Sequence, residues 1–280
     1  MRDRFNSVPQ ILPSRLPTPS MPPTPEPKAI LFDLGGVCVP SPFQAILDFE
    51  RSQNIPVGWV NHAIQGKTPN GSWHCIERGD VPLDEDWFAW FKRDLEDPAL
   101  WKGFHVKMNG GERPALPVPN IDAECLFWKM MEAVRGPDEY MLSALQKLKA
   151  SGRFIVAALS NTVIFPEGHP YNTPTSAGAD LLSQFDVFIS SAHVGMRKPD
   201  PKIYELAVQE LDKFDQARGG NGLKPGEIVF LDDIGDNLKT ARSLGLRTIR
   251  VRLGKIKDAV KELEAVTGVS LAEGEERAKL

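Results

Sequence analysis

Five short runs, most of them apolar and each long enough for one strand, alternate with helical segments along most of this 280-residue chain. The runs cover residues 29–33, 154–159, 187–190, 228–231 and 247–251. Continuous apolar runs of this length are typical of strands buried on both faces, as in a parallel sheet. Strands that alternate with helices and are joined by right-handed crossovers predict an α/β fold with a doubly wound parallel sheet.

A long helical block separates the first strand from the other four. Residues 84–95, for example, begin with an acidic turn and carry Trp87, Phe91 and Leu95 at helical spacing. Residues 103–120 are rich in Gly, Pro and Asn and are predicted to form a loop. We therefore expect a core made of residues 28–40 and 137–270, with residues 41–136 inserted as a helical domain.

Both ends of the chain are predicted to be tails. Residues 1–27 contain eight of the 24 prolines, and a segment of this kind lacks the apolar surface to offset the entropy of ordering. We expect this segment to be disordered and extended, and residues 271–280 to form a short C-terminal tail. Arg2, Arg4 and Arg15, with few acids among them, also fit a mitochondrial transit peptide.

Composition narrows the range of partners. A net charge of −4 and a pI near 5.8 provide no basic surface for nucleic acid or for an anionic membrane. No apolar run approaches the roughly 20 residues that a membrane span needs. Because the three cysteines, Cys38, Cys75 and Cys125, share no CxxC spacing, we predict reduced thiols and a cytoplasmic protein. The composition does not indicate an oligomeric state.

Charged and polar residues follow four of the five predicted strands. They are Asp33, then Ser160 and Asn161, then Lys198, and finally Asp232 and Asp233. Parallel strands bring their carboxyl ends to one edge of a sheet, so these groups are expected to converge. Three neighbouring carboxylates repel one another unless cations lie among them, and a lysine together with Mg²⁺ would meet that need. Such a site suits phosphoryl transfer, with Asp33 as the nucleophile.

These segments resemble the motifs of the haloacid dehalogenase-like hydrolases. Residues 32–37 (FDLGGV) look like the first motif and residues 159–162 (LSNT) like the second. Residues 195–201 (GMRKPDP) look like the third, and residues 229–237 (VFLDDIGDN) like the fourth. The branch that looks most similar contains the N-terminal phosphatase domain of soluble epoxide hydrolase and bacterial sugar-phosphate phosphatases. The resemblance implies a Rossmann-like core with a helical cap inserted after the first motif.

The resemblance also implies a magnesium site. The ligands would be the Asp33 side chain, the backbone carbonyl of Gly35 and the Asp233 side chain. Asp232 and Asn237 would support these ligands from behind. Mg²⁺ is therefore the expected cofactor.

A phosphate site follows from the same resemblance. Lys198 would orient Asp33 and the phosphate, while Ser160 and the Asn161 N–H would bind phosphate oxygens. The expected activity is hydrolysis of a small phosphorylated metabolite through an aspartyl-phosphate intermediate.

Position 35 departs from the pattern of the family. Most phosphatases of the superfamily carry a second aspartate there, which protonates the leaving group and later activates water. General acid–base help of this kind contributes about 10²–10⁴-fold to a rate. Either the leaving group departs without that help, or the cap supplies an acid, for which His74 and Glu77 are the candidates.

Two other functions remain open at this point. A 2-haloacid dehalogenase-type hydrolase shares the first three motifs, also lacks the second aspartate and needs no metal. The paired acids Asp232 and Asp233 favour the metal-dependent phosphohydrolase over that alternative. A catalytically weak binding or scaffold protein with the same fold is the third possibility, and Gly35 is the residue that favours it.

Overall fold

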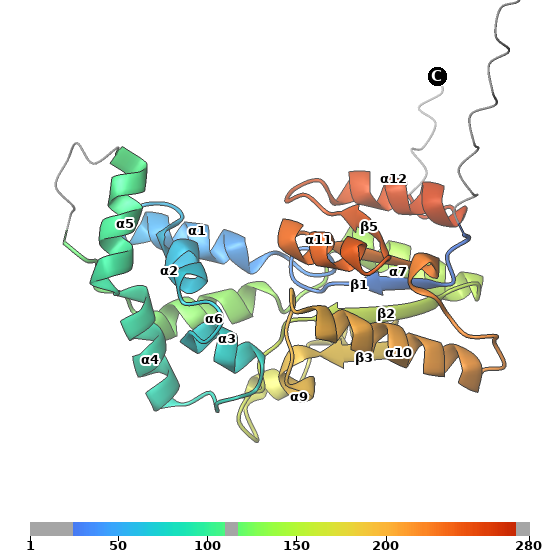
Figure 1. Cartoon of the computed structure of the whole chain (residues 1–280), viewed down its shortest axis with the longest axis horizontal. Helices are drawn as coiled ribbons and strands as arrows, with labels where there is room; N and C mark the ends of the chain where they lie inside the picture. The colour runs from blue at the N-terminus through green and yellow to red at the C-terminus, as the bar shows by residue number, and fades with distance from the viewer. Residues whose placement is uncertain (1–24, 110–116, 273–280) are drawn as a thin grey trace, which may run out of the picture.

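The computed structural model describes residues 25–109 and 117–272, and its centre is a five-stranded parallel sheet (Figure 1). The strands lie in the order β3-β2-β1-β4-β5. They are β1 (Ala29–Phe32), β2 (Ile155–Ser160), β3 (Val187–Ser190), β4 (Ile228–Asp232) and β5 (Arg247–Arg250). All four pairings are parallel, and β1 is hydrogen-bonded to β2 on one side and to β4 on the other. The predicted α/β fold with a doubly wound sheet is confirmed.

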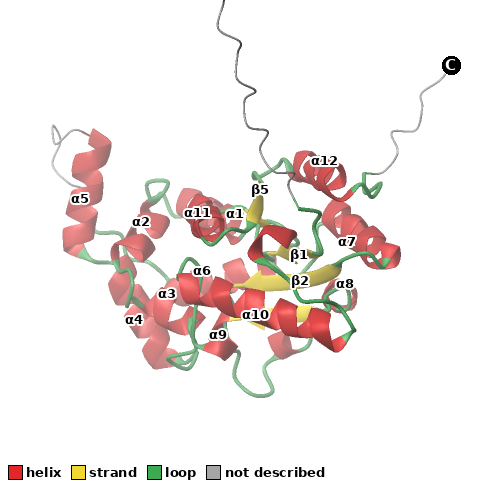
Figure 2. Ribbon diagram, turned by 45° about the vertical axis from the view of Figure 1, so that its right-hand side comes forward, coloured by secondary structure: helices red, strands yellow, loops and turns green. Residues whose placement is uncertain are grey.

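Helices cover both faces of the sheet (Figure 2). On one face α7 (Glu139–Ser151) and α12 (Ile256–Thr267) pack on side chains such as Ile30, Phe32 and Val229. On the other face α10 (Pro201–Ala217) and α11 (Gly235–Ser243) pack on the alternate residues, such as Leu31 and Phe230. The shorter elements of this part are η1 (Pro170–Asn172), α8 (Ser176–Leu182), α9 (Ser191–Val194) and η2 (Pro225–Glu227). Alternation of side chains along each strand therefore feeds two separate apolar layers.

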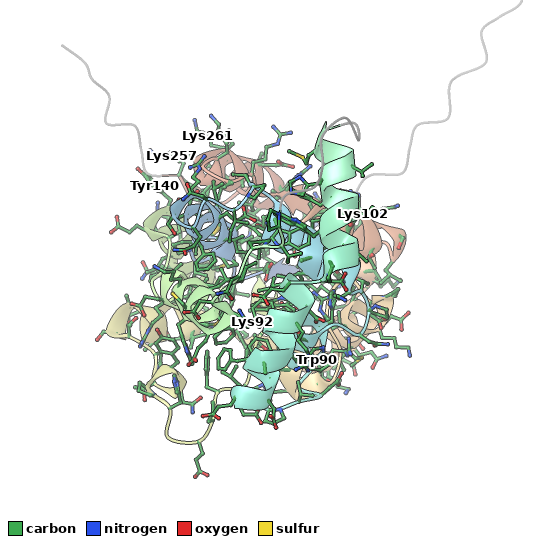
Figure 3. All side chains as sticks on the ribbon, turned by 90° about the vertical axis from the view of Figure 1, so that its left-hand side faces the viewer. Trp90, Lys92, Lys102, Tyr140, Lys257 and Lys261 are labelled. Atoms are coloured by element: carbon green, nitrogen blue, oxygen red, sulfur yellow. The ribbon has the colours of Figure 1, made fainter. Side chains whose placement is uncertain are left out.

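One contact between two of these helices is visible in Figure 3. Lys257 of α12 lies over the ring of Tyr140 of α7, with its Nζ 4.2 Å from the ring centroid. The two helices on this face of the sheet are thus joined at their surface as well as through their apolar sides.

Six helices form a second group beside the sheet, on the left in Figure 1. They are α1 (Pro42–Ser52), α2 (Trp59–Gly66), α3 (Ser72–Glu77), α4 (Glu85–Leu95), α5 (Pro98–Asn109) and α6 (Ala123–Ala133). Their buried side chains form a hydrophobic cluster of their own, rich in aromatic rings such as Trp87, Phe91 and Phe127. The rings of Trp87 and Phe91 are stacked with centroids 5.1 Å apart. We refer to this group of helices as the cap.

Side chains that accept hydrogen bonds from the first backbone N–H groups of a helix explain where several of these helices begin. Asp84 accepts a hydrogen bond from the Trp87 N–H at the start of α4, and Asp122 accepts one from the Cys125 N–H at the start of α6. Lys92 of α4, labelled in Figure 3, donates to the Ile121 carbonyl at 2.9 Å and so joins α4 to the segment before α6.

The predicted loop is shorter than expected. The loop predicted over residues 103–120 was wrong at its start, because α5 continues to Asn109. Within α5, Trp101 and Phe104 are buried against Trp59, with ring centroids 4.7 and 5.5 Å apart, and this packing outweighs the low helix propensity of Gly103.

The predicted tails fall mostly outside the described residues, since residues 1–24 and 273–280 are not described. The prediction that the C-terminal tail begins at residue 271 was wrong at its first residue. Leu271 is 1% exposed, and its N–H donates to Glu264 Oε2 at 2.7 Å. Residue 271 is therefore part of the packed core.

Candidate active site

The site forms around Asp33, the residue directly after the central strand β1. Its backbone N–H continues the pairing with β4 by donating to the Leu231 carbonyl at 2.9 Å. Its side chain is buried, and Oδ1 accepts from the Leu34 N–H at 2.7 Å and contacts Lys198 Nζ at 2.8 Å. Burial is the main cause that raises the pKa of Asp33 to about 7; Asp232 and Asp233 add to the increase, and Lys198 opposes it.

Lys198 lies between two carboxylates. Its Nζ is 2.8 Å from Asp33 Oδ1 and 2.8 Å from Asp232 Oδ2, and the side chain is 1% exposed. Burial works against the charged ammonium, but the two carboxylates outweigh it and raise the pKa of Lys198. The lysine therefore stays charged and holds Asp33 in one orientation.

Asp232 is saturated with hydrogen bonds. Besides Lys198, it accepts from the Ile234 N–H at 2.7 Å and from Asn237 Nδ2 at 3.1 and 3.0 Å on its two oxygens. A carboxylate that is fully hydrogen-bonded in this way has little capacity left for a ligand. Asp232 is thus held by Lys198 and Asn237 next to Asp33, and the predicted role of Asp232 and Asn237 behind the metal ligands stays a prediction.

Asp233 is different. Its Oδ1 is buried and has no hydrogen-bond partner among the described residues. One oxygen each of Asp33, Asp232 and Asp233 can lie within 4.8 Å of the others. Burial and the neighbouring Asp232 raise the pKa of Asp233 to about 6. A buried carboxylate oxygen without a partner, close to two further carboxylates, fits a hard cation such as Mg²⁺.

Gly35 and Gly36 follow Leu34 and form the turn beside Asp233. Gly36 has a φ of +74°, and a Cβ at this position would lie 2.4 Å from Asp233 Oδ2. Only glycine therefore allows the turn to approach Asp233 so closely. Gly35 is less restricted, since a Cβ there would meet the Pro42 ring at 3.4 Å, an ordinary contact.

The predicted phosphate-binding residues lie at the end of β2. Ser160 is buried and lines the same cavity as Asp33, Gly35, Lys198 and Asp233. The Asn161 side chain accepts from the Lys198 N–H at 2.8 Å and donates to the Lys198 carbonyl at 3.1 Å. Asn161 therefore also holds the segment that presents Lys198, a role that the sequence did not suggest.

The two predicted cap acids have different positions. Glu77, at the end of α3, reaches the cavity, but its Oε2 is paired with Arg197 Nε at 2.7 Å. His74 is 1% exposed, its Nε2 is 3.0 Å from Thr68 Oγ1, and it lines neither cavity described below. Burial lowers the pKa of His74 to about 4, and Arg197 and Arg78 add to the shift. His74 is therefore buried as a neutral side chain inside the cap, and the prediction that it serves as an acid at the site is corrected.

Sequence reasoning missed Arg197 as a site residue. Its guanidinium lies in the cavity and joins the core to Glu77 of the cap. The available signal was its position directly before Lys198. A second core–cap bond accompanies it, since Ser191 Oγ donates to the Glu77 carbonyl at 2.5 Å.

Two cavities meet at this point. The first, which we call the polar cavity, measures about 130 Å³ and contains Asp33, Lys198, Asp233 and Arg197. The second, which we call the apolar cavity, measures about 370 Å³ and extends from Gly35 toward the end of α6 and the segment 162–182. Ser160 and Asn161 line both.

Comparison with known proteins identifies the family. The family model of the haloacid dehalogenase-like hydrolases matches residues 27–245. The mouse acyl-CoA dehydrogenase family member 10 is 30% identical over 87% of this chain, and the pig bifunctional epoxide hydrolase 2 is 31% identical over 87%. The chain spans only 19% and 39% of the lengths of these two relatives. The sesquiterpene phosphatase astK of Aspergillus oryzae is 25% identical over 78% of this chain and 87% of its own length.

No helix within residues 25–109 and 117–272 is both long enough and apolar enough to cross a bilayer.

The family model covers the central strand, the cap and the three later strand ends that carry the site residues. The chain belongs to the haloacid dehalogenase-like hydrolases.

Proposed function

We propose that this protein is a magnesium-dependent phosphatase that cleaves a phosphate monoester through an aspartyl-phosphate on Asp33. The observation that carries the proposal is the asymmetry among the three carboxylates. Asp232 is saturated, whereas Asp233 Oδ1, beside Asp33, is buried and has no partner within the described ranges 25–109 and 117–272. A cation bound there would satisfy Asp233 and lie next to the nucleophile.

The proposed first step uses the free oxygen of Asp33. Among the described residues, both bonds to this carboxylate end on Oδ1, from Lys198 and from the Leu34 N–H. Oδ2 attacks phosphorus, the bond between phosphorus and the ester oxygen breaks, and the leaving alkoxide takes a proton from water in the cavity. Water then attacks the aspartyl-phosphate, releases inorganic phosphate and restores the carboxylate.

Other residues hold the phosphate during these steps. Ser160, the ammonium of Lys198 and the guanidinium of Arg197 all line the polar cavity, and each is a donor suited to phosphate oxygens. Mg²⁺, held by Asp33, the Gly35 carbonyl and Asp233, would supply charge neutralisation between the anionic phosphate and the anionic nucleophile. Glu77, paired with Arg197, adjusts the position of that guanidinium.

A relative supports the choice of phosphate ester. The chain aligns with most of the length of a protein named as a sesquiterpene phosphatase. Attack of a carboxylate on carbon, as in 2-haloacid dehalogenases, gains nothing from a cation beside Asp233. The unpartnered Asp233 oxygen therefore favours phosphate ester hydrolysis over halide release, and a pure scaffold would have no need to keep it buried.

The test is phosphate and halide release by the purified chain, with Mg²⁺ and with EDTA. We expect phosphate release only with Mg²⁺, its loss in Asp33→Asn, and its retention in the matched control Asp236→Asn, which changes an exposed acid in the same part of the fold. Halide release from 2-chloropropionate, independent of Mg²⁺, would replace the proposal with the dehalogenase. Failure to release either product would support the scaffold.

A further inference from the structure

We propose that the substrate is a phosphate monoester with a long apolar chain, and that the chain lies in the apolar cavity. This inference rests on the proposed phosphatase function and specifies its substrate. Much of the cavity wall comes from segment 162–182 of the core, so the cap alone would not determine specificity.

The two cavities adjoin at the position where the ester bond would lie. They share six residues, namely Gly35, Pro42, Trp73, Glu77, Ser160 and Asn161. Ser160 and Asn161 follow β2, and Gly35 lies two residues after the nucleophile. A phosphate held in the polar cavity therefore has its ester oxygen next to the mouth of the apolar cavity.

The apolar cavity is walled mainly by hydrocarbon. Leu34 and Leu181 come from the core, Met131 comes from α6 of the cap, and Val163 and Phe165 come from the loop after β2. Its volume of about 370 Å³ lies within the usual range for ligand pockets. If each water-sized group occupies about 30 Å³, the cavity holds on the order of ten carbon atoms.

Polar side chains of this wall already have partners, two of which lie outside the wall. Tyr171 donates its hydroxyl to Glu132 Oε2 at 2.7 Å, and Thr162 Oγ1 lies 2.6 Å from Ser190 Oγ. The Arg135 guanidinium lies over the Tyr171 ring, 4.4 Å from its centroid.

This arrangement disfavours a sugar. The hydroxyls of a sugar phosphate would lose water in the apolar cavity without gaining partners, and each unsatisfied hydroxyl costs about 1–3 kcal/mol. A hydrocarbon chain meets no such cost and gains from burial.

The experiment is a series of straight-chain alkyl phosphates from ethyl to dodecyl, used below their micelle concentrations with Mg²⁺, beside glucose 6-phosphate. We expect kcat/KM to rise about two- to fourfold for each added methylene and to level off near ten carbons. Glucose 6-phosphate should be a poorer substrate than hexyl phosphate. A flat response, or a preference for glucose 6-phosphate, would overturn the inference.

A double variant tests whether the dependence of kcat/KM on chain length arises from the wall of the apolar cavity. Met131→Gln with Val163→Thr keeps side-chain size but adds polar atoms, and it should lower the ratio of kcat/KM for decyl phosphate to that for ethyl phosphate about tenfold. The matched control is Met108→Gln with Val106→Thr, the same changes on exposed positions of α5. An equal drop of the ratio in both variants would contradict the assignment.

Binding of alkyl phosphonates separates this inference from the proposed function. Phosphonates cannot be hydrolysed, so their affinity, measured by titration calorimetry, tests the cavity without turnover. Affinity that increases with chain length in the absence of any phosphatase activity would keep the apolar site and refute the phosphatase. Phosphatase activity without a dependence on chain length would do the reverse.

Discussion

The polar and apolar cavities share an edge but are built in different ways. The charged groups of the polar cavity come from residues that directly follow strands or their connecting turns, and hydrogen bonds fix most of them. The apolar cavity is walled by a loop, two helix ends and a short helix, and polar groups of its wall such as Tyr171 and Thr162 are bonded to residues outside the wall. We infer that residues at the strand ends carry out the proposed chemistry. The segment after β2 and the cap would then select the substrate.

The largest expected effect comes from removing the positive charge of Lys198 from the polar cavity. Lys198→Met would leave Asp33 and Asp232 buried without their shared partner, so we expect the unfolding free energy to fall by about 3–5 kcal/mol. Phosphate release should fall about 10³-fold or more for long and short chains alike, because the loss concerns only the chemistry. Urea unfolding and kinetic assays measure both.

The control is Lys213→Met. Lys213 forms a comparable ion pair with Glu210, 2.7 Å apart, but its side chain is 68% exposed, and such a pair contributes less than about 1 kcal/mol. A similar loss of stability in the two variants would show that burial of Lys198 is not what makes the pair strong.

The second prediction concerns the close approach of Gly36 to Asp233. Gly36→Ala adds a Cβ that would displace Asp233 Oδ2, so the Mg²⁺ concentration needed for half-maximal activity should rise about tenfold or more. The control is Gly152→Ala, which has a similar φ of +64° but open space around its Cβ. Both variants should lose about 1–2 kcal/mol of stability from the left-handed backbone, but only Gly36→Ala should weaken the Mg²⁺ response.

Third, Gly35→Asp tests the boundary between the two cavities. The backbone at position 35 accepts a side chain, and the new carboxyl would stand where the ester oxygen leaves. We expect hydrolysis of alkyl phosphates to accelerate about 10-fold or more, since general acid help is worth about 10²–10⁴-fold. Gly35→Asn has the same size without the acid and should not accelerate it. A decrease in both variants would mean that the turn needs glycine itself.

The smallest effect on activity should come from His74, which lies in neither cavity and is expected to act on stability alone. Its pKa is lowered to about 4, so between roughly pH 6.5 and 4 the unfolded chain binds a proton there and the folded chain does not. This difference lowers the unfolding free energy as the pH falls, by about 3 kcal/mol in total. In His74→Gln, stability measured from pH 7 to 4 should decline less steeply than in the native chain. An identical decline would contradict the buried neutral histidine.

Much of the polar cavity could be predicted from the sequence, because parallel strands necessarily bring their carboxyl ends together. Asp33 and Asp232 were identified as acids at the ends of apolar runs, and Lys198 as the charged residue in the segment after the third run. Lys198 contacts both acids. The bounds of β3 were also predicted without error. Polar residues flank its short apolar run on both sides and so limit where the strand can begin and end.

The rest could not be predicted, since it depends on packing between distant segments. The second half of α5 forms because Trp101 and Phe104 find Trp59, and no local pattern shows that contact. The pairing of Glu77 with Arg197 joins residues far apart in the sequence. The wall of the apolar cavity includes seven residues from segment 162–175, a segment with no periodicity.

The central position of β1 has a consequence for how this chain becomes functional. Asp33 meets Ser160 only when β2 has paired on one side, and it meets Asp232 only when β4 has paired on the other. These pairings close long loops, which form slowly compared with local contacts. Turnover is therefore expected to report complete folding. A chain in which one of these strands has not yet paired contains Asp33 but lacks the rest of the site and should be inactive.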